Sequence, residues 1–345
     1  MAGTVRTWLQ KVILWFDTEG HEVPGGGDGA PKHVDLPRVL PFIAVHLVCL
    51  GVIWVGWSPV AVGVALLGYA VRMFAITGFY HRYFSHRTFR TSRFWQFFFA
   101  VIGNSSTQRG PLWWAAHHRK HHRHSDTEAD PHSPDQHGFL WSHMLWLTSP
   151  QNFATDINEV RDLAKFRELR FLNRFDTLVP VAYAAGTVVL GMLLEKYVPS
   201  LGTTGPQMLI WGYFISTVAL FHGTCTINSL AHRIGTRRYE TGEASRNNLL
   251  LALITFGEGW HNNHHYCPGA TRQGFFWWEV DLTYYVLKVL SWIGIVQDLH
   301  PVPARAYGSS GMVGRSSTDE PDPAGRFGSV PKQAEMPDVP AGGTR

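Results

Sequence analysis

Histidine is the residue type whose number and spacing in this sequence could do chemistry. Nineteen histidines occur among 345 residues. The spacing H-x-x-H-H occurs twice, at 118–122 and 261–265, and H-x-x-x-x-H occurs at 81–86. Positions i, i+3 and i+4 share one face of a helix, so each H-x-x-H-H set can aim three imidazoles at a small volume. Because imidazole suits iron, zinc, copper and nickel, the pattern predicts a transition-metal site.

The number of candidate ligands favours two metal ions. His81 and His86 stand about 140° apart on an ideal α-helix, which suits a helix end or opposite sides of a two-metal cluster. Asn228 and His232 are i and i+4, so both can face one site. One metal ion takes about four to six ligands, fewer than the candidates offer. These candidates are His81, His86, His118, His121, His122, His232, His261, His264 and His265.

Eight other histidines have simpler interpretations. Isolated histidines are more often core or surface residues than ligands, and those flanking the second cluster are not assigned as ligands. H-E-x-x-H is absent, which disfavours a zincin-type protease, and no G-x-S-x-G or Walker pattern accompanies the clusters. The histidines set aside are His46, His143, His222, His300, His117, His124, His132 and His137.

The elements that must position these histidines include membrane spans. Charged residues make up 16% of the chain, where a soluble domain carries about 25%. Residues 39–71 contain no Asp, Glu, Lys or Arg and exceed the roughly 20 residues of one crossing. Gly56 to Pro59 divides them into a hairpin. Two further uncharged runs complete four predicted spans, at about 39–56, 60–80, 177–194 and 207–231.

Loop charge orients these spans. Residues 72–176 carry 14 of the 30 Lys and Arg residues, so the positive-inside rule places this segment and both termini in the cytoplasm. All the histidine clusters fall on that side. We therefore expect an all-α integral membrane protein with four transmembrane helices and a cytoplasmic helical cap that holds a His-rich dimetal site.

Three domains follow from composition. Residues 1–38 form a cytoplasmic N-terminal segment with an interfacial helix and a Gly-rich linker. Residues 39–300 form the membrane domain, and 301–345 form a disordered tail. Apolar segments at 94–103, 139–148 and 275–296 are predicted to lie in the membrane interface. The three cysteines have no C-x-x-C spacing, the modest net charge disfavours nucleic-acid binding, and no signal peptide is expected.

Four motifs in order resemble a known family over about 70–300. They are TGFYHRYFSHRTF (77–89), HRKHHRHSDTEADPH (118–132), NSLAHR (228–233) with RNN (246–248), and GEGWHNNHH (257–265). The chain resembles the membrane fatty acid desaturases, specifically the acyl-CoA Δ9, stearoyl-CoA-type branch. The resemblance implies two iron ions with the nine candidate histidines as ligands, and Asn228 holding a metal-bound water. The spacing does not divide the nine between the irons.

The resemblance also implies an activity. An O₂-dependent desaturase would place a cis double bond, at Δ9, into a saturated chain carried by coenzyme A or by a lipid. A separate electron carrier, such as a ferredoxin or cytochrome b5-like protein with its reductase, would supply electrons. By hypothesis, Asp126, Asp130 and Glu258 orient ligand histidines, and Arg119 and Lys120 receive the substrate headgroup.

Two other functions remain open at this point. A hydroxylase of the same di-iron architecture differs in the fate of one radical, and the H-x-x-x-x-H box with G-E-G favours desaturation over it. A His-rich metal-binding or transport protein would place ionisable groups near the bilayer midplane, whereas these gather outside the spans. The lack of a fused electron donor suggests a bacterial inner membrane.

Overall fold

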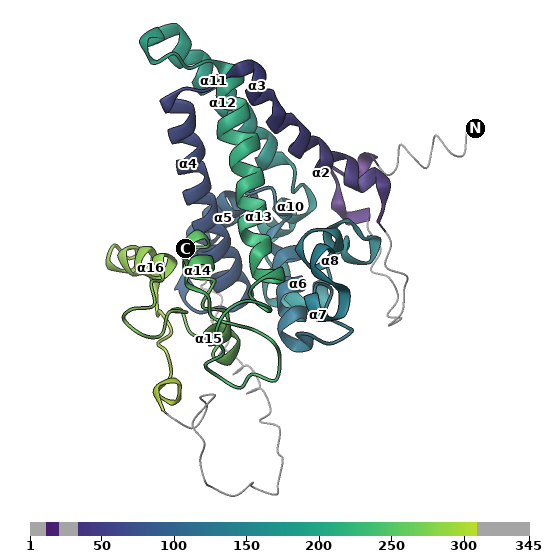
Figure 1. The fold of residues 1–345 in the computed structure, drawn as a ribbon, viewed down its shortest axis with the longest axis vertical. Coiled ribbons are helices and arrows are strands. Elements are labelled where there is room, and N and C mark those ends of the chain that lie inside the picture. Colours follow the sequence, from purple (N-terminus) through teal and green to yellow (C-terminus); the bar gives the residue numbers. More distant parts are fainter. Residues whose placement is uncertain (1–11, 21–33, 309–345) are drawn as a thin grey trace, which may run out of the picture. The chain divides into compact units, whose positions relative to one another are not determined.

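The computed structural model describes residues 12–20 and 34–308, and within them the chain is mostly helical (Figure 1). Three helical runs are long and apolar enough to cross a membrane: Pro59–Ser85, Leu178–Tyr197 and Gly205–Ser229. They agree with three of the four predicted spans. The first predicted span corresponds to a shorter apolar helical run, Val39–Val55. Membrane association is therefore supported by three helices.

Each long helical run is built from named elements. The first joins α4 (Pro59–Phe74) to η3 (Ala75–Ser85), the second is α11 (Leu178–Tyr197), and the third joins α12 (Gly205–Met208), η8 (Leu209–Ile215) and α13 (Ser216–Ser229). The shorter apolar run consists of α2 (Leu36–Val48), η2 (Cys49–Gly51) and α3 (Val52–Val55).

Local sequence explains where two of these runs begin. Ser58 accepts a hydrogen bond from the Ala61 N–H, and Pro59 follows it at the first helical position. Thr204 and Gln207 form a reciprocal capping box at the start of α12. Both arrangements satisfy N–H groups that a helix start leaves without partners.

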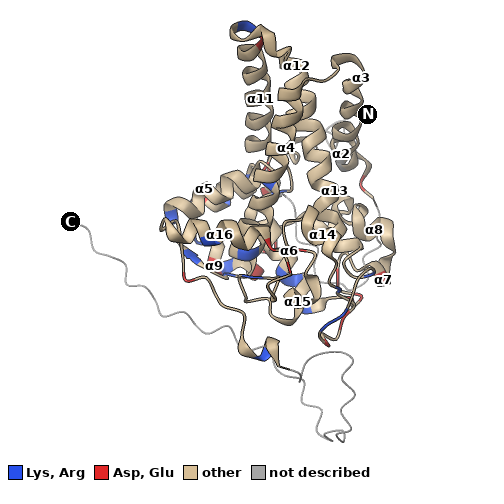
Figure 2. Cartoon of the chain, turned by 60° about the vertical axis from the view of Figure 1, so that its left-hand side comes forward, with Lys and Arg blue, Asp and Glu red and all other residues tan. Residues whose placement is uncertain are grey.

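The charged residues gather at one end of the long helices. Figure 2 shows α4, α12 and α13 almost free of Lys, Arg, Asp and Glu, whereas the elements around α6, α9 and α15 carry many.

The other described helices are mostly short. They are η1 (Thr18–Gly20), α5 (Arg93–Asn104), α6 (Pro111–His124), α7 (Pro134–His137), α8 (Phe139–His143), η4 (Leu145–Thr148), η5 (Pro150–Asn152), η6 (Ile157–Val160), α9 (Arg161–Ala164), α10 (Arg167–Arg174), η7 (Pro199–Leu201), α14 (Leu249–Ile254), α15 (His261–Tyr266), α16 (Leu282–Trp292) and η9 (Ala304–Tyr307).

The main core packs η3 against α5, α6 and α10. Phe79 of η3 stacks on Phe99 of α5 with ring centroids 3.7 Å apart, and Leu112 of α6 is fully buried in the same cluster. Strands β1 (Arg90–Thr91) and β2 (Val296–Gln297) pair antiparallel beside it. This packing connects the end of the first long run to the helix that carries the second histidine cluster.

The segment 275–296 differs from the predicted interfacial helix. Only Leu282–Trp292 is α-helical. Glu279 and Asp281 precede α16 and are fully buried, where Glu279 pairs with Arg238 and Asp281 pairs with Arg82. Asp281 also caps α16 by accepting from the Tyr284 N–H. Both carboxylates of this segment are therefore internal ion-pair partners.

The predicted N-terminal segment and tail are described in part. Residues 301–308 carry η9, and the Tyr239 hydroxyl donates to the Ala306 carbonyl at 2.7 Å. Near the other end, Arg174 forms two hydrogen bonds with Asp17. The Gly-rich linker at 25–29 and the rest of the tail, 309–345, lie outside the described residues.

Candidate metal centre

Nine imidazoles converge on two adjacent groups near one end of the long helices. The nitrogen atoms within each group all lie within 4.8 Å of one another. They are the nine histidines named from the sequence. The first group holds His81, His86, His118, His122 and His264, and the second holds His121, His232, His261 and His265.

Each H-x-x-H-H cluster contributes to both groups. On α6, His118 and His122 enter the first group while His121 enters the second. On α15 the division is reversed, with His264 in the first group and His261 and His265 in the second. The i and i+4 imidazoles lie closest in direction, and the i+3 imidazole is rotated toward the neighbouring group. The expectation that each cluster serves a single small volume was therefore too simple.

A π-helix brings His81 and His86 together. The element η3 has π-helical geometry, and the His86 N–H bonds to the His81 carbonyl at 3.2 Å. A helix with i to i+5 bonds holds more residues per turn than an α-helix, so residues five apart lie closer to one face than they do on an α-helix. The two ring centroids are 4.9 Å apart, and both rings belong to the first group. The 140° separation of an α-helix does not apply here, because the helix type is different.

The nitrogen contacts fit metal ligation better than hydrogen bonding. Glu258 lies 2.5 Å from His81 Nδ1, so a neutral His81 carries its proton there and points a lone pair from Nε2. That Nε2 lies 3.0 Å from His264 Nε2, which is itself 2.9 Å from His122 Nε2. In zinc sites an imidazole nitrogen lies about 2.0–2.1 Å from the metal. Two such nitrogens that bind one metal at right angles are therefore roughly 3 Å apart. A cation at the centre of the group would relieve the lone-pair repulsion.

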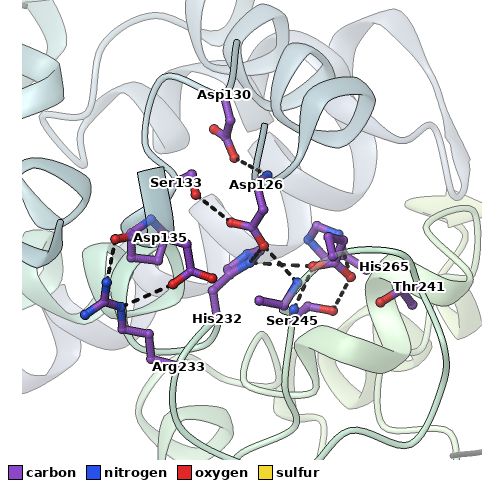
Figure 3. Close-up of polar contacts among 12 residues, drawn as sticks. Asp126, Asp130, Ser133, Asp135, His232, Arg233, Thr241, Ser245 and His265 are labelled. Atoms are coloured by element: carbon purple, nitrogen blue, oxygen red, sulfur yellow. Dashed lines mark hydrogen bonds and ion pairs between the residues drawn. The ribbon is translucent and has the colours of Figure 1, made fainter. Parts of the chain in front are cut away.

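The outer nitrogens of three ligand candidates face carboxylates. Besides the Glu258–His81 contact, Asp130 lies 2.9 Å from His121 Nδ1 and Asp126 lies 2.9 Å from His232 Nδ1. Figure 3 shows Asp126 between Ser133 and His232, with Asp130 beyond it. Each carboxylate can hold the Nδ1 proton and leave Nε2 free for a metal. The sequence predicted this role for the same three acids, and the role itself stays a prediction.

Further groups that no sequence motif indicates lie around the histidines. Glu243 lies 3.5 Å from His232 Nδ1 and 3.7 Å from His265 Nδ1. The Gln273 amide lies 3.3 Å from His81 Nδ1 and 3.4 Å from His264 Nδ1. Neither residue belongs to a histidine motif. Their proximity depends on how the loops 230–248 and 267–281 fold over α15.

A buried charge network supports His81. Arg82 is buried and pairs with Glu258 at 3.1 Å and with Asp281 at 2.9 Å. The two glycines that flank Glu258 allow this segment to pack closely against neighbouring residues. Gly257 has a φ of +125°, and a side chain there would meet Asp281, while a Cβ at Gly259 would lie 2.1 Å from the Ala252 nitrogen. The G-E-G sequence is thus required by backbone geometry and close packing.

Burial keeps most of the candidate ligands in the neutral form. Burial, followed by the neighbouring imidazoles, lowers the pKa of six of them well below the ordinary value. Burial disfavours charge on His121 too, but the Asp130 carboxylate outweighs it and raises the pKa of His121. Burial raises the pKa of Asp126, yet the bond from His232 lowers it to about 2 overall. The six are His86, His118, His122, His261, His264 and His265.

Two cavities meet at the histidine groups. The larger has a volume of about 300 Å³ and is lined mostly by aromatic and aliphatic side chains. The smaller, of about 50 Å³, reaches His81, His121 and His261. Trp114, His118, Thr224 and Asn228 line both cavities. Asn228 thus lines both cavities, and the smaller cavity also contains histidines of both groups.

Arg119 and Lys120 differ in their surroundings. The Arg119 guanidinium uses all five N–H groups within the protein, donating to the carbonyls of Phe84, Ser85 and Glu159 and twice to the Asp162 carboxylate. Lys120 is exposed. Their predicted contact with a substrate headgroup stays a prediction.

The described part of the chain therefore defines a membrane-associated helical protein with a His-rich centre that could hold metal ions. Residues 56–288 match the model of the fatty acid desaturase family. The chain belongs to that family.

Individual relatives agree with this assignment. The chain is 34% identical over 278 residues to an acyl-CoA 5-desaturase of Anemone leveillei, covering 79% of this chain and 81% of that protein. It is 36% identical over 265 residues to an sn-1 stearoyl-lipid 9-desaturase of Anabaena variabilis, covering 76% and 92%. A Delta-9 acyl-lipid desaturase of Arabidopsis thaliana is 36% identical over 271 residues, covering 78% and 84%. These relatives are oxidoreductases, and they differ in the carrier of the acyl chain.

Proposed function

We propose that this protein is an O₂-dependent fatty acyl desaturase that introduces a cis double bond, at Δ9, into a saturated chain. The observation that carries the proposal is the meeting of the two cavities at the two imidazole groups. An acyl chain in the larger cavity would pass Trp114 and Thr224 and present its middle carbons beside His118 and Asn228. The family membership supports the same reaction.

The nine histidines would hold two iron ions. Five imidazoles would bind one ion, and four imidazoles with a water held by Asn228 would bind the other. Bound iron would supply oxidation of two adjacent unactivated methylenes by O₂. The substrate would lose two hydrogen atoms, an external donor would supply two electrons, two protons would come from solvent, and two waters would form. The electron donor would be a separate ferredoxin or cytochrome b5-like protein with its reductase.

The protein's own residues would bind the acyl chain, orient the ligand histidines and shield the metal centre from water. Glu258, Asp126 and Asp130 would hold the Nδ1 protons of His81, His232 and His121 and so aim each Nε2 at the metal. The aromatic walls of the larger cavity would exclude water and restrict the chain to one path. Acyl-CoA, expected from the sequence, and a lipid-bound acyl chain present the same methylenes, so this reaction does not depend on the carrier.

The proposed topology adds a fourth span and a cytoplasmic cap. Helices α2 to α3 form a continuous helical run from Leu36 to Val55, long enough for about 30 Å at 1.5 Å per residue. The charged elements at the histidine end would face the cytoplasm of a bacterial cell, with both termini on that side and 39–300 as the membrane domain.

A fatty-acid profile tests the proposed reaction. Cells of a desaturase-deficient host would express the wild-type chain or His121→Ala, and mass spectrometry would measure their fatty acids. New cis-monoenes with wild type alone would support desaturation, and derivatisation would locate the bond. Hydroxylated chains in their place would favour the related hydroxylase chemistry and contradict the proposal.

A further inference from the structure

The larger cavity is bounded by elements that belong to the membrane-facing part of the chain. Phe42, Val45 and His46 of α2 form one wall, and Thr177 at the start of α11 lies on another. Trp15, from the described N-terminal segment, also lines it. The cavity then continues inward to the residues that it shares with the metal centre.

Large apolar side chains are exposed immediately beside these walls. On α2, Ile43 and Leu47 are 44% and 58% exposed and alternate with the lining residues. On α11, Leu178 follows the lining residue Thr177 and is 52% exposed. Because α11 is long and apolar enough to span a bilayer, these surfaces suit contact with lipid. The cavity is therefore flanked by exposed apolar surface on two helices, of which α11 is long and apolar enough to span a bilayer and α2 belongs to the proposed fourth span.

The cations near this entrance are neutralised by carboxylates. Arg109 lines the cavity and pairs with Asp176 at 2.9 Å. Arg174, two residues before Asp176, pairs with both Asp17 and Glu19. Asp17 in turn follows the lining residue Trp15 by two positions. These charges are already compensated within the protein.

Two neighbouring cations complete the rim. Arg170 also faces Glu19, at 3.8 Å. The exposed Lys120 stands three residues after the lining residue His117. Apart from Lys120, these cations pair with carboxylates, whereas the several phosphates of coenzyme A need several unpaired Arg or Lys side chains.

We propose that this desaturase takes its acyl chain from a membrane glycerolipid with an uncharged or zwitterionic headgroup, which enters sideways from the bilayer between α2 and α11. This inference rests on the proposed desaturase function. The ester would stay at the level of the lipid headgroups near Trp15 and the Arg109–Asp176 pair, and the chain would extend inward to the metal centre.

A pulse–chase experiment in the same expressing cells tests the carrier. A short pulse of ¹³C-stearate and deuterated glycerol labels new lipids, and an excess of unlabelled precursors follows. Mass spectrometry then measures only lipids that retain both labels. If the lipid is the substrate, the labelled monoene fraction should rise at least twofold during the chase. A fraction that stays constant from the start of the chase would show desaturation before transfer to glycerol and overturn the inference.

Failure of the proposed function gives a different result in this experiment. In that case no labelled monoene forms at any time, in the pulse or in the chase, and both proposals fall. A constant but nonzero monoene fraction rejects only the lipid carrier.

A matched pair of variants on α2 tests the entrance. Val45→Trp places a large ring in the cavity, whereas Leu47→Trp places one on the lipid-facing side of the same helix. Conversion during the chase should fall at least tenfold with Val45→Trp and stay within twofold of wild type with Leu47→Trp. Equal rates for the two variants, with both proteins present in the membrane at wild-type levels, would contradict entry past α2.

Discussion

Two sets of histidines in this molecule look alike in contact distance and differ in arrangement. Nine imidazoles converge as two groups, whereas His46, His222 and His143 form a linear chain. His46 Nε2 lies 3.1 Å from His222 Nε2, and His222 Nδ1 lies 3.0 Å from His143 Nε2. The chain ends at the Ser229 hydroxyl, 2.9 Å from His143 Nδ1.

The linear chain can satisfy its hydrogen bonds with neutral rings. His46 Nδ1 must donate to the Phe42 carbonyl at 2.8 Å, which leaves His46 Nε2 as an acceptor. His222 then donates from Nε2 and accepts at Nδ1, and His143 donates from Nε2. The His143 Nδ1 can accept the single Ser229 hydroxyl proton when that proton turns away from the Cys225 carbonyl, which lies 3.0 Å from the same hydroxyl. Every nitrogen has a role without a metal. This linear chain of histidines therefore connects α2 and α8 to α13.

In the convergent groups, the contacts between ring nitrogens cannot all be hydrogen bonds. His118 Nε2 lies 2.8 Å from His86 Nε2 and 3.0 Å from His122 Nε2, and no ring nitrogen can donate to two partners. In addition, carboxylates occupy the outer nitrogens of His81, His121 and His232. In the convergent groups, one nitrogen of each of these three rings faces a carboxylate and the other points toward neighbouring imidazole nitrogens. In the linear chain of histidines, each ring nitrogen has a single hydrogen-bond partner. This difference distinguishes a set of metal ligands from a structural hydrogen-bonded row.

Removal of a convergent imidazole should have the largest effect. His121→Ala and His264→Ala are each expected to abolish turnover and to lower the iron content of the purified protein, because each removes one predicted metal–nitrogen bond. His300→Ala, outside both groups, should change neither. Metal analysis and product analysis of the three variants measure this, and equal activity in all three would reject the ligand assignment.

Acid should affect the convergent groups strongly when metal is absent. Burial lowers the pKa of six of these histidines, so below about pH 6.5 the unfolded chain binds more protons than the folded chain. Stability is then fully present above that pH and is lost as pH falls, by up to about 1.4 kcal/mol per pH unit for each imidazole. Thermal unfolding of the metal-free protein in detergent, between pH 8 and 5, measures this. An unfolding temperature that rises on acidification would contradict the neutral state assigned to these rings.

Changes to the supporting carboxylates should weaken metal binding without abolishing it. Asp130→Asn and Glu258→Gln keep the side-chain size but remove the charge that holds the Nδ1 proton, and are expected to lower iron affinity about 10- to 100-fold. Asp135→Asn is the control, since Asp135 faces Arg233 at 3.7 Å and contacts no predicted ligand. Competition with a chelator compares the three, and a loss of the same size in the control would reject a specific role.

Disruption of the linear chain should have the smallest effect on metal. His222→Ala is expected to destabilise the fold by about 1–3 kcal/mol, because it leaves the nitrogens of His46 and His143 without partners. Iron content per folded chain should stay at the wild-type level. Denaturation in detergent with parallel metal analysis separates the two quantities, and loss of iron with unchanged stability would place these histidines in the metal centre.

Much of the candidate site follows from sequence alone. The repeated H-x-x-H-H spacing and the H-x-x-x-x-H box contain eight of the nine converging histidines, and the ninth, His232, directly follows the last uncharged run. The ligand chemistry of imidazole and the periodicity of helices are local properties, so the sequence can indicate these residues. The same reasoning names Asp126, Asp130 and Glu258, which stand within a few residues of the clusters. Three of the four predicted spans correspond to long apolar helices, because a long uncharged run has few other stable environments.

Other features were decided by tertiary structure. The π-turn of η3 places His86 beside His81, and nothing in their spacing specifies that helix type. The division of each H-x-x-H-H cluster between the two groups depends on how α6 and α15 face each other. Glu243 and Gln273 reach the ligands from loops outside any motif, and Glu279 and Asp281 are buried by partners 41 and 199 residues away. Contacts between distant segments depend on packing and charge pairing across the whole fold, which local spacing does not contain.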